Sequence, residues 1–205
     1  MPKRNRILTS LRNEGLIRSL KFLTRRSINK IIKKEMVFFW HNVNKERIYS
    51  DNASFEVFSK KYNQDKIAQV LGQNLLEKTK SRIENGEVLV CLFLDKTLAG
   101  YGWGGYQSSL YFSYVANGID LNKEIFYIYD CFTYPGFRGK GVYPLVLAKL
   151  CEVSDRSEVY VACQSVNESS IKGILKAEFE RYKDFVLVDL YFFRFKFVIS
   201  LKDRK

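Results

Sequence analysis

Histidine is nearly absent from this 205-residue sequence, and its cysteines are few and widely spaced. The one histidine, His41, follows an aromatic run and is expected to pack rather than to react. The four cysteines lie 40, 20 and 12 residues apart, at Cys91, Cys131, Cys151 and Cys163. The sequence therefore predicts no zinc-type site, and a Ser/His or Cys/His catalytic pair would depend on His41 alone. The cysteines are expected to be reduced and mostly buried.

Long apolar runs are also missing. Thr97–Ile119 carries no charge for 23 residues, but it contains five glycines together with several amide and hydroxyl side chains. Such a stretch is too polar to face lipid, and strands joined by a loop explain it better. The N-terminus lacks the uninterrupted apolar segment of a secretion signal. These features predict a cytoplasmic protein.

Positive charge is what the sequence has in excess. It contains 34 Lys and Arg against 22 Asp and Glu, which gives a formal net charge of +12. Residues 1–47 hold 13 of the basic residues and 3 glutamates, whereas residues 48–205 are nearly neutral. This division predicts a basic arm over 1–47 and one globular domain over 48–205. The chain is 46% hydrophobic, which is enough to build a core without disulfides or metal.

The basic arm has the periodicity of a helix. Between residues 6 and 34, apolar residues recur three and four apart with Lys and Arg between them. A basic amphipathic helix of this kind can lie peripherally on an anionic membrane, or it can pack its apolar stripe on the body of the protein. Nucleic acid is a less favoured partner. The sequence leaves the oligomeric state open.

Hydrophobic periodicity divides the domain into helices and strands. Residues 48–86 look helical, with Asn63 or Asp65 as a cap and Asn85-Gly86 as the stop. Further on, the pattern predicts two helices, at Val142–Val153 and Glu168–Ala177. It predicts strands at Val88–Leu94, Leu98–Trp103, Leu110–Val115, Glu124–Thr133, Glu158–Gln164 and Phe185–Ile199.

Two glycine-rich segments suggest phosphate binding, and the first is a weak candidate. Gly100–Gly105 matches the pattern Gly-x-Gly-x-x-Gly, but strand-like residues follow where a dinucleotide loop requires a helix. These glycines are better explained as part of a strand that a neighbouring backbone or ligand approaches closely.

The second segment has the required order of strand, loop and helix. Tyr134–Pro144 reads Tyr-Pro-Gly-Phe-Arg-Gly-Lys-Gly-Val-Tyr-Pro and connects an apolar strand to an amphipathic helix. Gly139 and Gly141 allow backbone amides to turn inward, and Arg138 and Lys140 add positive charge. Amides at a helix N-terminus bind anions, so the loop predicts a phosphate site. It is no Walker A loop, because the terminal Gly-Lys-Ser/Thr is missing.

This loop resembles the pyrophosphate loop of the GNAT superfamily of N-acetyltransferases. The similarity rests on Pro135-x-x-Arg-Gly-Lys-Gly-Val142 and on Asn167–Phe179, which resembles the family's Asn-x-x-Ala…Lys-x-Gly-Phe helix. The hairpin Val88–Trp103 also fits, and the resemblance covers about residues 86–197. It implies an α/β fold of the α+β type: a twisted mixed sheet, mostly antiparallel, with helices on both faces, splayed to admit acetyl-coenzyme A.

The resemblance also implies acetyl transfer from acetyl-coenzyme A to an amine, without a metal. It assigns the pyrophosphate to five consecutive amides, those of Arg138, Gly139, Lys140, Gly141 and Val142. The backbone at Phe132 and Thr133 would pair with the pantetheine arm, and Asn167 would contact the cofactor near its acyl end. Ile174 stands where the family often has the tyrosine that protonates the leaving thiolate, so the general acid is unassigned.

Acyl transfer to an amine needs a base, because an amine attacks only when it is neutral. Asp130 lies among aromatic neighbours shortly before the loop, and it is the candidate base if it is partly desolvated. An ion-paired, purely structural Asp130 is an equal alternative, and Glu124 is a second candidate base. Tyr143, at the helix start, could protonate the thiolate or merely pack. Cys131 would offer an acyl-cysteine route, although nothing nearby in sequence activates its thiol.

Two functions are compatible with these residues. The first is an N-acetyltransferase whose acceptor is a small amine, with an aminosugar or nucleotide-sugar of glycan synthesis as the leading choice and protein amines as further ones. Five aromatic residues of the hairpin would suit a sugar if they face the acceptor, although core packing is the better explanation for any single one: Trp103, Tyr106, Tyr111, Phe112 and Tyr114. The alternative is a non-catalytic module of the same fold, whose arm binds an anionic membrane or nucleic acid. Ile174 favours the alternative, and the glycines at 139 and 141 oppose it.

Overall fold

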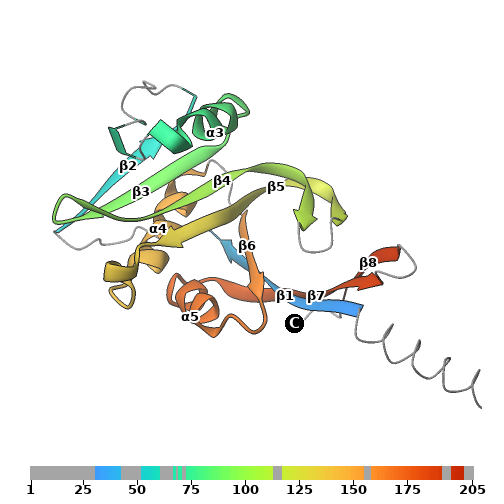
Figure 1. Ribbon diagram of the computed structural model, residues 1–205. Helices are drawn as coiled ribbons and strands as arrows, with labels where there is room; N and C mark the ends of the chain where they lie inside the picture. Colours follow the sequence, from blue (N-terminus) through green and yellow to red (C-terminus); the bar gives the residue numbers. More distant parts are fainter. Residues whose placement is uncertain are drawn as a thin grey trace, which may run out of the picture.

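A computed structural model describes residues 31–42, 52–60, 67, 69–70, 73–112, 117–154, 158–190 and 195–200. In these ranges eight strands form one sheet in the order β2-β3-β4-β5-β6-β1-β7-β8 (Figure 1). Neighbouring strands are antiparallel except β5 and β6, which run parallel. The strands are β1 (Ile31–Asn42), β2 (Ala53–Phe58), β3 (Val88–Leu94), β4 (Thr97–Phe112), β5 (Asn117–Thr133), β6 (Glu158–Gln164), β7 (Glu180–Leu190) and β8 (Phe195–Ser200). The helices are α3 (Gln73–Glu84), α4 (Val142–Val153), α5 (Glu168–Lys176) and a 3-10 turn, η1 (Pro135–Phe137).

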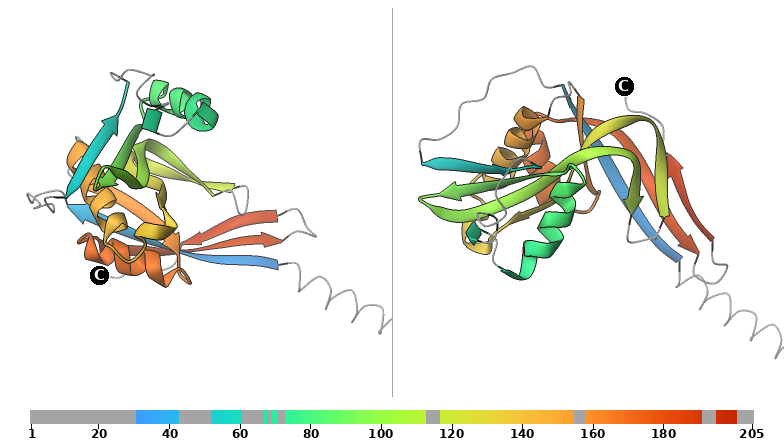
Figure 2. Two further views of the ribbon diagram at one scale, coloured as in Figure 1. Left: turned by 60° about the vertical axis from the view of Figure 1, so that its left-hand side comes forward. Right: turned by 90° about the horizontal axis from the view of Figure 1, so that it is seen from above.

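Helices cover both faces of the sheet, so the expected α/β fold is confirmed (Figure 2). The core divides between the two faces because successive residues of β3 point in opposite directions. Leu89 and Cys91 pack with Ile83 of α3 on one face. Val90 and Leu92 pack with α4 and α5 on the other.

Several elements have the bounds that the sequence predicts. β3, α4 and β6 begin and end at the expected residues, and α5 is one residue shorter than expected. Asp95 and Lys96 have φ values of 48° and 63°, the left-handed pair that a two-residue hairpin turn requires. Gly86, with φ of 87°, follows the end of α3 as predicted.

Other expectations about the elements are wrong. Residues 48–86 are not helical throughout, because Ala53–Phe58 forms the edge strand β2, whose alternate residues pack on the core. The segments from Leu98 and from Leu110 belong to one strand, β4, because the polar residues between them continue the pairing with β5. Phe185–Ile199 is not one strand. It contains parts of β7 and β8, which pair antiparallel from Phe185 with Ser200 to Leu190 with Phe195.

The expected end of the helical arm is wrong as well. Ile31–Asn42 forms β1, which lies between β6 and β7 and is antiparallel to both. Ile31–Asn42 is rich in β-branched and aromatic residues, a composition typical of strands. His41 pairs with Val159 of β6 in this register. Residues 1–30 and 43–50 lie outside the described residues, so the membrane and nucleic-acid contacts of the arm stay predictions.

The glycines of β4 allow α4 to approach the sheet closely. Gly100, Gly102 and Gly104 alternate along the strand and therefore share one face. A Cβ atom at Gly102 would lie 2.8 Å from Cγ1 of Val146 in α4, and one at Gly104 would lie 2.5 Å from Cζ of Phe126. The interpretation of this Gly-x-Gly pattern as a strand with close neighbours is confirmed.

No helix within the described ranges is long and apolar enough to cross a membrane.

A methyl group on the glycine face of β4 should destabilise the fold. We expect Gly104→Ala to lower the free energy of unfolding by about 1–3 kcal/mol, because the Phe126 ring or α4 must move. Chemical denaturation followed by circular dichroism measures this. Gly136→Ala is the matched control: an added Cβ there meets nothing within 4 Å, and the change should stay below about 0.5 kcal/mol. A Gly104→Ala protein as stable as wild type would contradict the packing argument.

Candidate functional site

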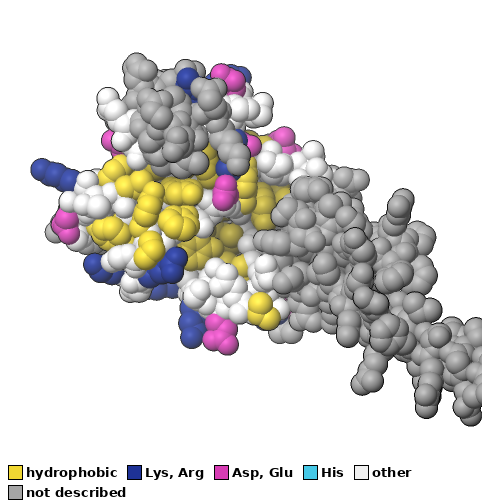
Figure 3. All heavy atoms as spheres, viewed as in Figure 1, with side chains coloured by type: hydrophobic (Ala, Val, Ile, Leu, Met, Phe, Trp, Pro, Cys, Tyr) yellow, Lys and Arg dark blue, Asp and Glu magenta, His cyan; other side chains and the backbone are white. Residues whose placement is uncertain are grey.

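β5 and β6 pair over a short distance and then diverge. Their parallel pairing runs from Phe126 with Val159 to Ile128 with Val161, after which each strand continues without the other. The divergence opens a cleft of about 1150 Å³, lined by both strands, the loop before α4, and α5. Figure 3 shows hydrophobic side chains over the middle of this face, with Lys and Arg side chains at its edge. The splay that the family resemblance implies is therefore present.

The loop at the start of α4 has the geometry of an anion cradle. Gly139 and Gly141 both have φ of 79°, a left-handed conformation that glycine adopts without strain. Gly141 is the N-cap of α4, and no side chain caps the helix there. Within the described chain, the amides of Gly139, Gly141 and Val142 donate to no carbonyl. Unpaired amides at the positive end of a helix dipole favour an anion.

The other two amides of the expected pyrophosphate set are used within the loop. The amide of Arg138 donates to the Pro135 carbonyl at 3.3 Å, and the amide of Lys140 donates to the Phe137 carbonyl at 3.3 Å. The ammonium of Lys140 lies 5.2 Å from the centroid of the Phe137 ring, and Lys140 does not line the cleft. The other residues expected at the cofactor do line it: Phe132, Thr133, Arg138, Gly139, Gly141, Val142 and Asn167.

Charge is distributed unevenly along the cleft. Three exposed basic residues, Arg138, Lys172 and Lys176, line the end formed by the loop and α5. Two carboxylates, Glu87 and Asp130, line the part nearest α3. The arrangement suits a ligand that is anionic at the α5 end.

Asn167 has a structural role in addition to its place in the cleft. Its Oδ1 accepts hydrogen bonds from the Ser170 amide at 3.1 Å and from the Ser169 hydroxyl at 2.9 Å, so it caps α5. An amide side chain at this position is explained by capping alone. Its contact with a cofactor stays a prediction.

Tyr143 lies in the first turn of α4, with its ring against α5. A Cβ atom at Gly173 would lie 2.5 Å from Cδ1 of Tyr143, so this glycine makes room for the ring. Tyr143 lines the cleft, and burial raises the pKa of its phenol well above the ordinary value. A tyrosine of ordinary pKa is already protonated near neutral pH, so this shift makes the hydroxyl a weaker acid, and a role as proton donor would depend on its position in the cleft.

Ile174 is fully buried in the main core, at the position of the family's tyrosine acid. Its side chain packs beneath α5 instead of facing the cleft, so the departure from the family pattern is explained by packing. Ile174 does not line the cleft, whereas Tyr143 does and has its ring against the neighbouring Gly173.

Asp130 is not desolvated, contrary to expectation. Its side chain is 63% exposed, and its carboxylate accepts a hydrogen bond from Nη1 of Arg82 at 2.7 Å. Two residues of β5, Asp130 and Cys131, lie opposite a single residue of β4, Gly102, which makes a β-bulge. Within this bulge Asp130 has φ of 52°. The ion-paired alternative is therefore present, and a role as base would depend on position rather than on desolvation. Glu124 is exposed and does not line the cleft.

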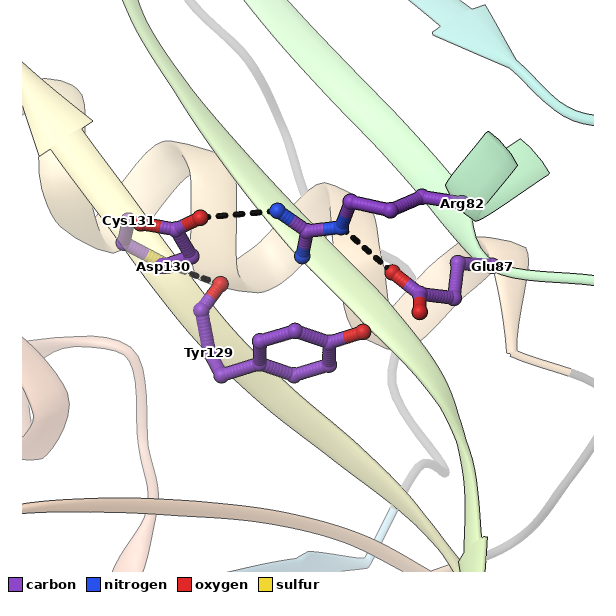
Figure 4. Close-up of polar contacts among 5 residues, drawn as sticks. All are labelled: Arg82, Glu87, Tyr129, Asp130 and Cys131. Carbon is purple, nitrogen blue, oxygen red and sulfur yellow. Dashed lines mark hydrogen bonds and ion pairs between the residues drawn. The ribbon is translucent and has the colours of Figure 1, made fainter. Parts of the chain in front are cut away.

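Sequence reasoning missed two residues on the α3 side: Arg82, which binds Asp130, and Glu87, which binds Arg82 (Figure 4). Nε of Arg82 donates to Glu87 at 2.6 Å. Arg82 and Asp130 are 48 residues apart, so no local pattern could have paired them. Glu87 directly follows the Asn85-Gly86 turn. This turn predicts the end of a helix, but it does not indicate a functional residue.

Two of the five aromatic residues expected to face an acceptor are placed differently. Trp103 is buried, with its ring centroid 3.8 Å from the guanidinium carbon of Arg82. Tyr106 packs edge-on against Phe126 in the core, with the ring centroids 5.3 Å apart. The side chains of Tyr111 and Phe112, and residue Tyr114, lie outside the described part. The rings that do line the cleft are those of Tyr127, Tyr129, Phe132, Phe137 and Tyr143.

The four cysteines are free, and all but the half-buried Cys131 are buried, as expected. Burial raises the pKa of the Cys91 and Cys131 thiols to about 12 and that of Cys163 to about 11. Cys131 lines the cleft, but its thiol stays protonated near neutral pH and is a poor nucleophile. The structure gives no support to an acyl-cysteine route. Among the described residues, no three His, Cys, Asp or Glu side chains gather as metal ligands would.

No protein-family model and no curated protein matches the sequence. Among solved structures, a functionally unknown conserved protein from Staphylococcus epidermidis is similar over 92% of this chain and 81% of its own, at 9% identity and a TM-score of 0.50. A GNAT-family acetyltransferase from Colwellia psychrerythraea matches 84% of this chain and 57% of its own, at 15% identity and a TM-score of 0.48. An aminoglycoside acetyltransferase from an uncultured soil sample matches 62% of this chain and 88% of its own, at 13% identity and a TM-score of 0.44. At these identities the likeness concerns the fold alone.

The raised thiol pKa values predict slow chemical modification. At pH 8 we expect Cys131 in the native protein to react with an aromatic disulfide reagent at least about 100-fold more slowly than free cysteine. Between pH 7 and 9 its rate should rise about tenfold per pH unit, because the thiolate fraction does so well below the pKa of about 12. Mass spectrometry of quenched samples measures this at each cysteine. Rapid modification of Cys131 at pH 7 would return the acyl-cysteine route to consideration.

Proposed function

We propose that this chain, whose fold is that of the GNAT superfamily, is an acetyltransferase that uses acetyl-coenzyme A and acetylates a primary amine of a small acceptor. The observation that most supports this is the loop before α4. There, two left-handed glycines leave three amides unpaired at a helix N-terminus, beside the cleft between β5 and β6. A pyrophosphate would bind at these amides. The pantetheine arm would run along β5 at Phe132 and Thr133.

The charges around the cleft agree with this orientation. Coenzyme A carries its phosphates at one end, and Arg138, Lys172 and Lys176 line the end of the cleft near the loop. The acyl group would then point toward the part of the cleft that Glu87 and Asp130 line. An amine acceptor, positively charged before it loses its proton, suits that acidic end.

The residues of the cleft can supply the proton transfers. Asp130 would take a proton from the ammonium or from the attacking amine, directly or through water. As the C–N bond forms and the C–S bond breaks, Tyr143 would give its proton to the leaving thiolate and regain one from solvent. A thiolate with a pKa of about 8.5 needs only modest help, so one phenol from α4 can replace the family's acid. Amides of the β5 bulge are candidates to stabilise the oxyanion.

The acceptor part of the cleft combines flat rings with a carboxylate. Tyr127 and Tyr129 are stacked, with their centroids 5.8 Å apart and an interplanar angle of 10°, and Phe132 is 41% exposed. Rings of this kind suit the apolar face of a sugar, and Asp130 suits its amine. An aminosugar or nucleotide-sugar is therefore our leading acceptor. Contact of residues 1–30 with an anionic membrane would place the enzyme near glycan synthesis.

Acetyl-coenzyme A should stabilise the wild-type protein against heat. At about 100 times its dissociation constant, a ligand adds roughly 2.7 kcal/mol to the free energy of unfolding. Gly139→Asp should abolish this gain, because it puts a side chain and a negative charge into the amide cradle. Asp adopts left-handed φ more readily than most residues, so the unliganded variant should still fold. Differential scanning fluorimetry with and without acetyl-coenzyme A measures both effects.

Gly136→Asp is the matched control for that experiment. It adds the same charge three residues away, where no neighbour lies within 4 Å and the residue does not line the cleft. It should keep most of the ligand-induced stabilisation. If saturating acetyl-coenzyme A leaves the melting temperature of the wild-type protein unchanged, the proposed function is wrong, and the non-catalytic alternative becomes the better one.

Removing the hydroxyl group of Tyr143 should slow turnover without weakening the binding of acetyl-coenzyme A. We expect Tyr143→Phe to lower kcat about 10- to 100-fold, at the low end for general acid catalysis because the thiolate is a fair leaving group. The KM for acetyl-coenzyme A should change little, since the ring remains against Gly173. Release of the coenzyme A thiol, with glucosamine among a panel of amines, gives both constants. Tyr182→Phe, outside the cleft, is the control, and an unchanged kcat in Tyr143→Phe would assign Tyr143 to packing.

A further inference from the structure

Arg82 is bound by more partners than any other basic side chain described for the site. Its Nε donates to Glu87 at 2.6 Å and its Nη1 to Asp130 at 2.7 Å. The guanidinium carbon lies 3.8 Å from the centroid of the Trp103 ring and 4.9 Å from that of Tyr129. Nη2 is buried and has no hydrogen-bond partner among the described residues. The hydrogen bonds of this side chain therefore go to two carboxylates that line the cleft.

The contacts of Arg82 require an irregular strand. Neighbouring side chains of a regular strand point to opposite faces, yet Tyr129 and Asp130 both contact Arg82 on the α3 face. The left-handed φ of Asp130 at the bulge breaks the alternation, and the next residue, Cys131, returns to the face of Gly102. A non-glycine residue in this conformation persists only where its surroundings hold it. Arg82 makes the contact that holds the Asp130 side chain.

A purely structural role explains this cluster poorly. α3 is already attached to the sheet by the buried residues Ile83 and Thr79. An ion pair with a carboxylate that is 63% exposed contributes little to folding stability. The ion pair instead fixes the orientation of the Asp130 carboxylate. The planar guanidinium of Arg82 is held by Glu87 and by the rings of Trp103 and Tyr129, so its Nη1 has one position. Asp130, at the surface of the cleft, would otherwise rotate freely.

We propose that Arg82 is a positioning residue, which holds Asp130 on the α3 side of the cleft in the orientation that receives the acceptor's proton. This inference rests on the proposed function, in which Asp130 is the base. Glu87 anchors the guanidinium from the other side, and it is 19% exposed. The end of α3 and the bulge of β5 thus form one unit, and an acceptor amine approaches Asp130 from the side that Arg82 leaves open.

Arg82→Gln removes both ion pairs and keeps a polar side chain. We expect kcat for coenzyme A release, with glucosamine or with water alone as the acceptor, to fall about 10- to 100-fold. The KM for acetyl-coenzyme A and the stabilisation by this ligand should change less than about threefold, because the cradle lies on another helix. Arg82→Lys, which keeps the charge but reaches one carboxylate at a time, should recover part of kcat. Arg181→Gln is the matched control, since Arg181 forms an ion pair with Asp184 at 2.8 Å outside the cleft.

A crystal structure of Arg82→Gln tests the same proposal without an acceptor. We expect Asp130 to leave the left-handed conformation or to turn its carboxylate away from α3. If Asp130 keeps both, or if kcat equals that of wild type, Arg82 does not position the base, while the proposed function stands. If the wild-type protein is neither stabilised by acetyl-coenzyme A nor able to release coenzyme A, both the proposed function and this inference are overturned.

Discussion

The site depends on how closely α4 can lie against β4. Three glycines on one face of β4 let α4 approach until the side chains of α4 touch the backbone of β4. A Cβ atom at Gly100, for example, would lie only 2.7 Å from Cγ1 of Val142. The first turn of α4 is therefore fixed at the end of β5, where that strand has parted from β6. The unpaired amides of the loop and the phenol of Tyr143 both take their positions from this contact. A helix held farther from the sheet would leave the amides beside the cleft without directing them into it.

Tyr143 and Gly173 show how the same packing determines the chemistry available. The ring of Tyr143 needs the space that Gly173 leaves, and the next residue, Ile174, is buried in the core. A phenol is thus brought to the cleft from α4, although α5 presents none at position 174. In our proposal the general acid is defined by where its hydroxyl lies, at the cleft, rather than by its place in the family's motif.

Sequence reasoning succeeded where structure is decided by neighbours in the chain. The hairpin turn at Asp95-Lys96, the apolar strands β3 and β6, and the loop that leads into α4 all follow from local residue types. It failed where a partner is distant. The periodicity of residues 6–34 extends a predicted helix into the first four residues of β1, because the pairing of β1 with β6 and β7 joins segments more than 100 residues apart and leaves no local pattern. The exposure of Asp130 and the role of Arg82 depend on a bulge and on an ion pair across 48 residues.

The place of β1 has a consequence for how the chain reaches its fold. β1 is made before β2 to β5, whereas its partners β6 and β7 are made after them, and β1 separates these two partners in the finished sheet. Pairings between such distant segments close large loops and form slowly. During translation β1 therefore stays unpaired while β2, β3 and β4 already have all of their neighbours in the sheet. The wall of the cleft formed by β6 is complete only when β1 has been inserted beside it, so within the described sheet the cleft forms late.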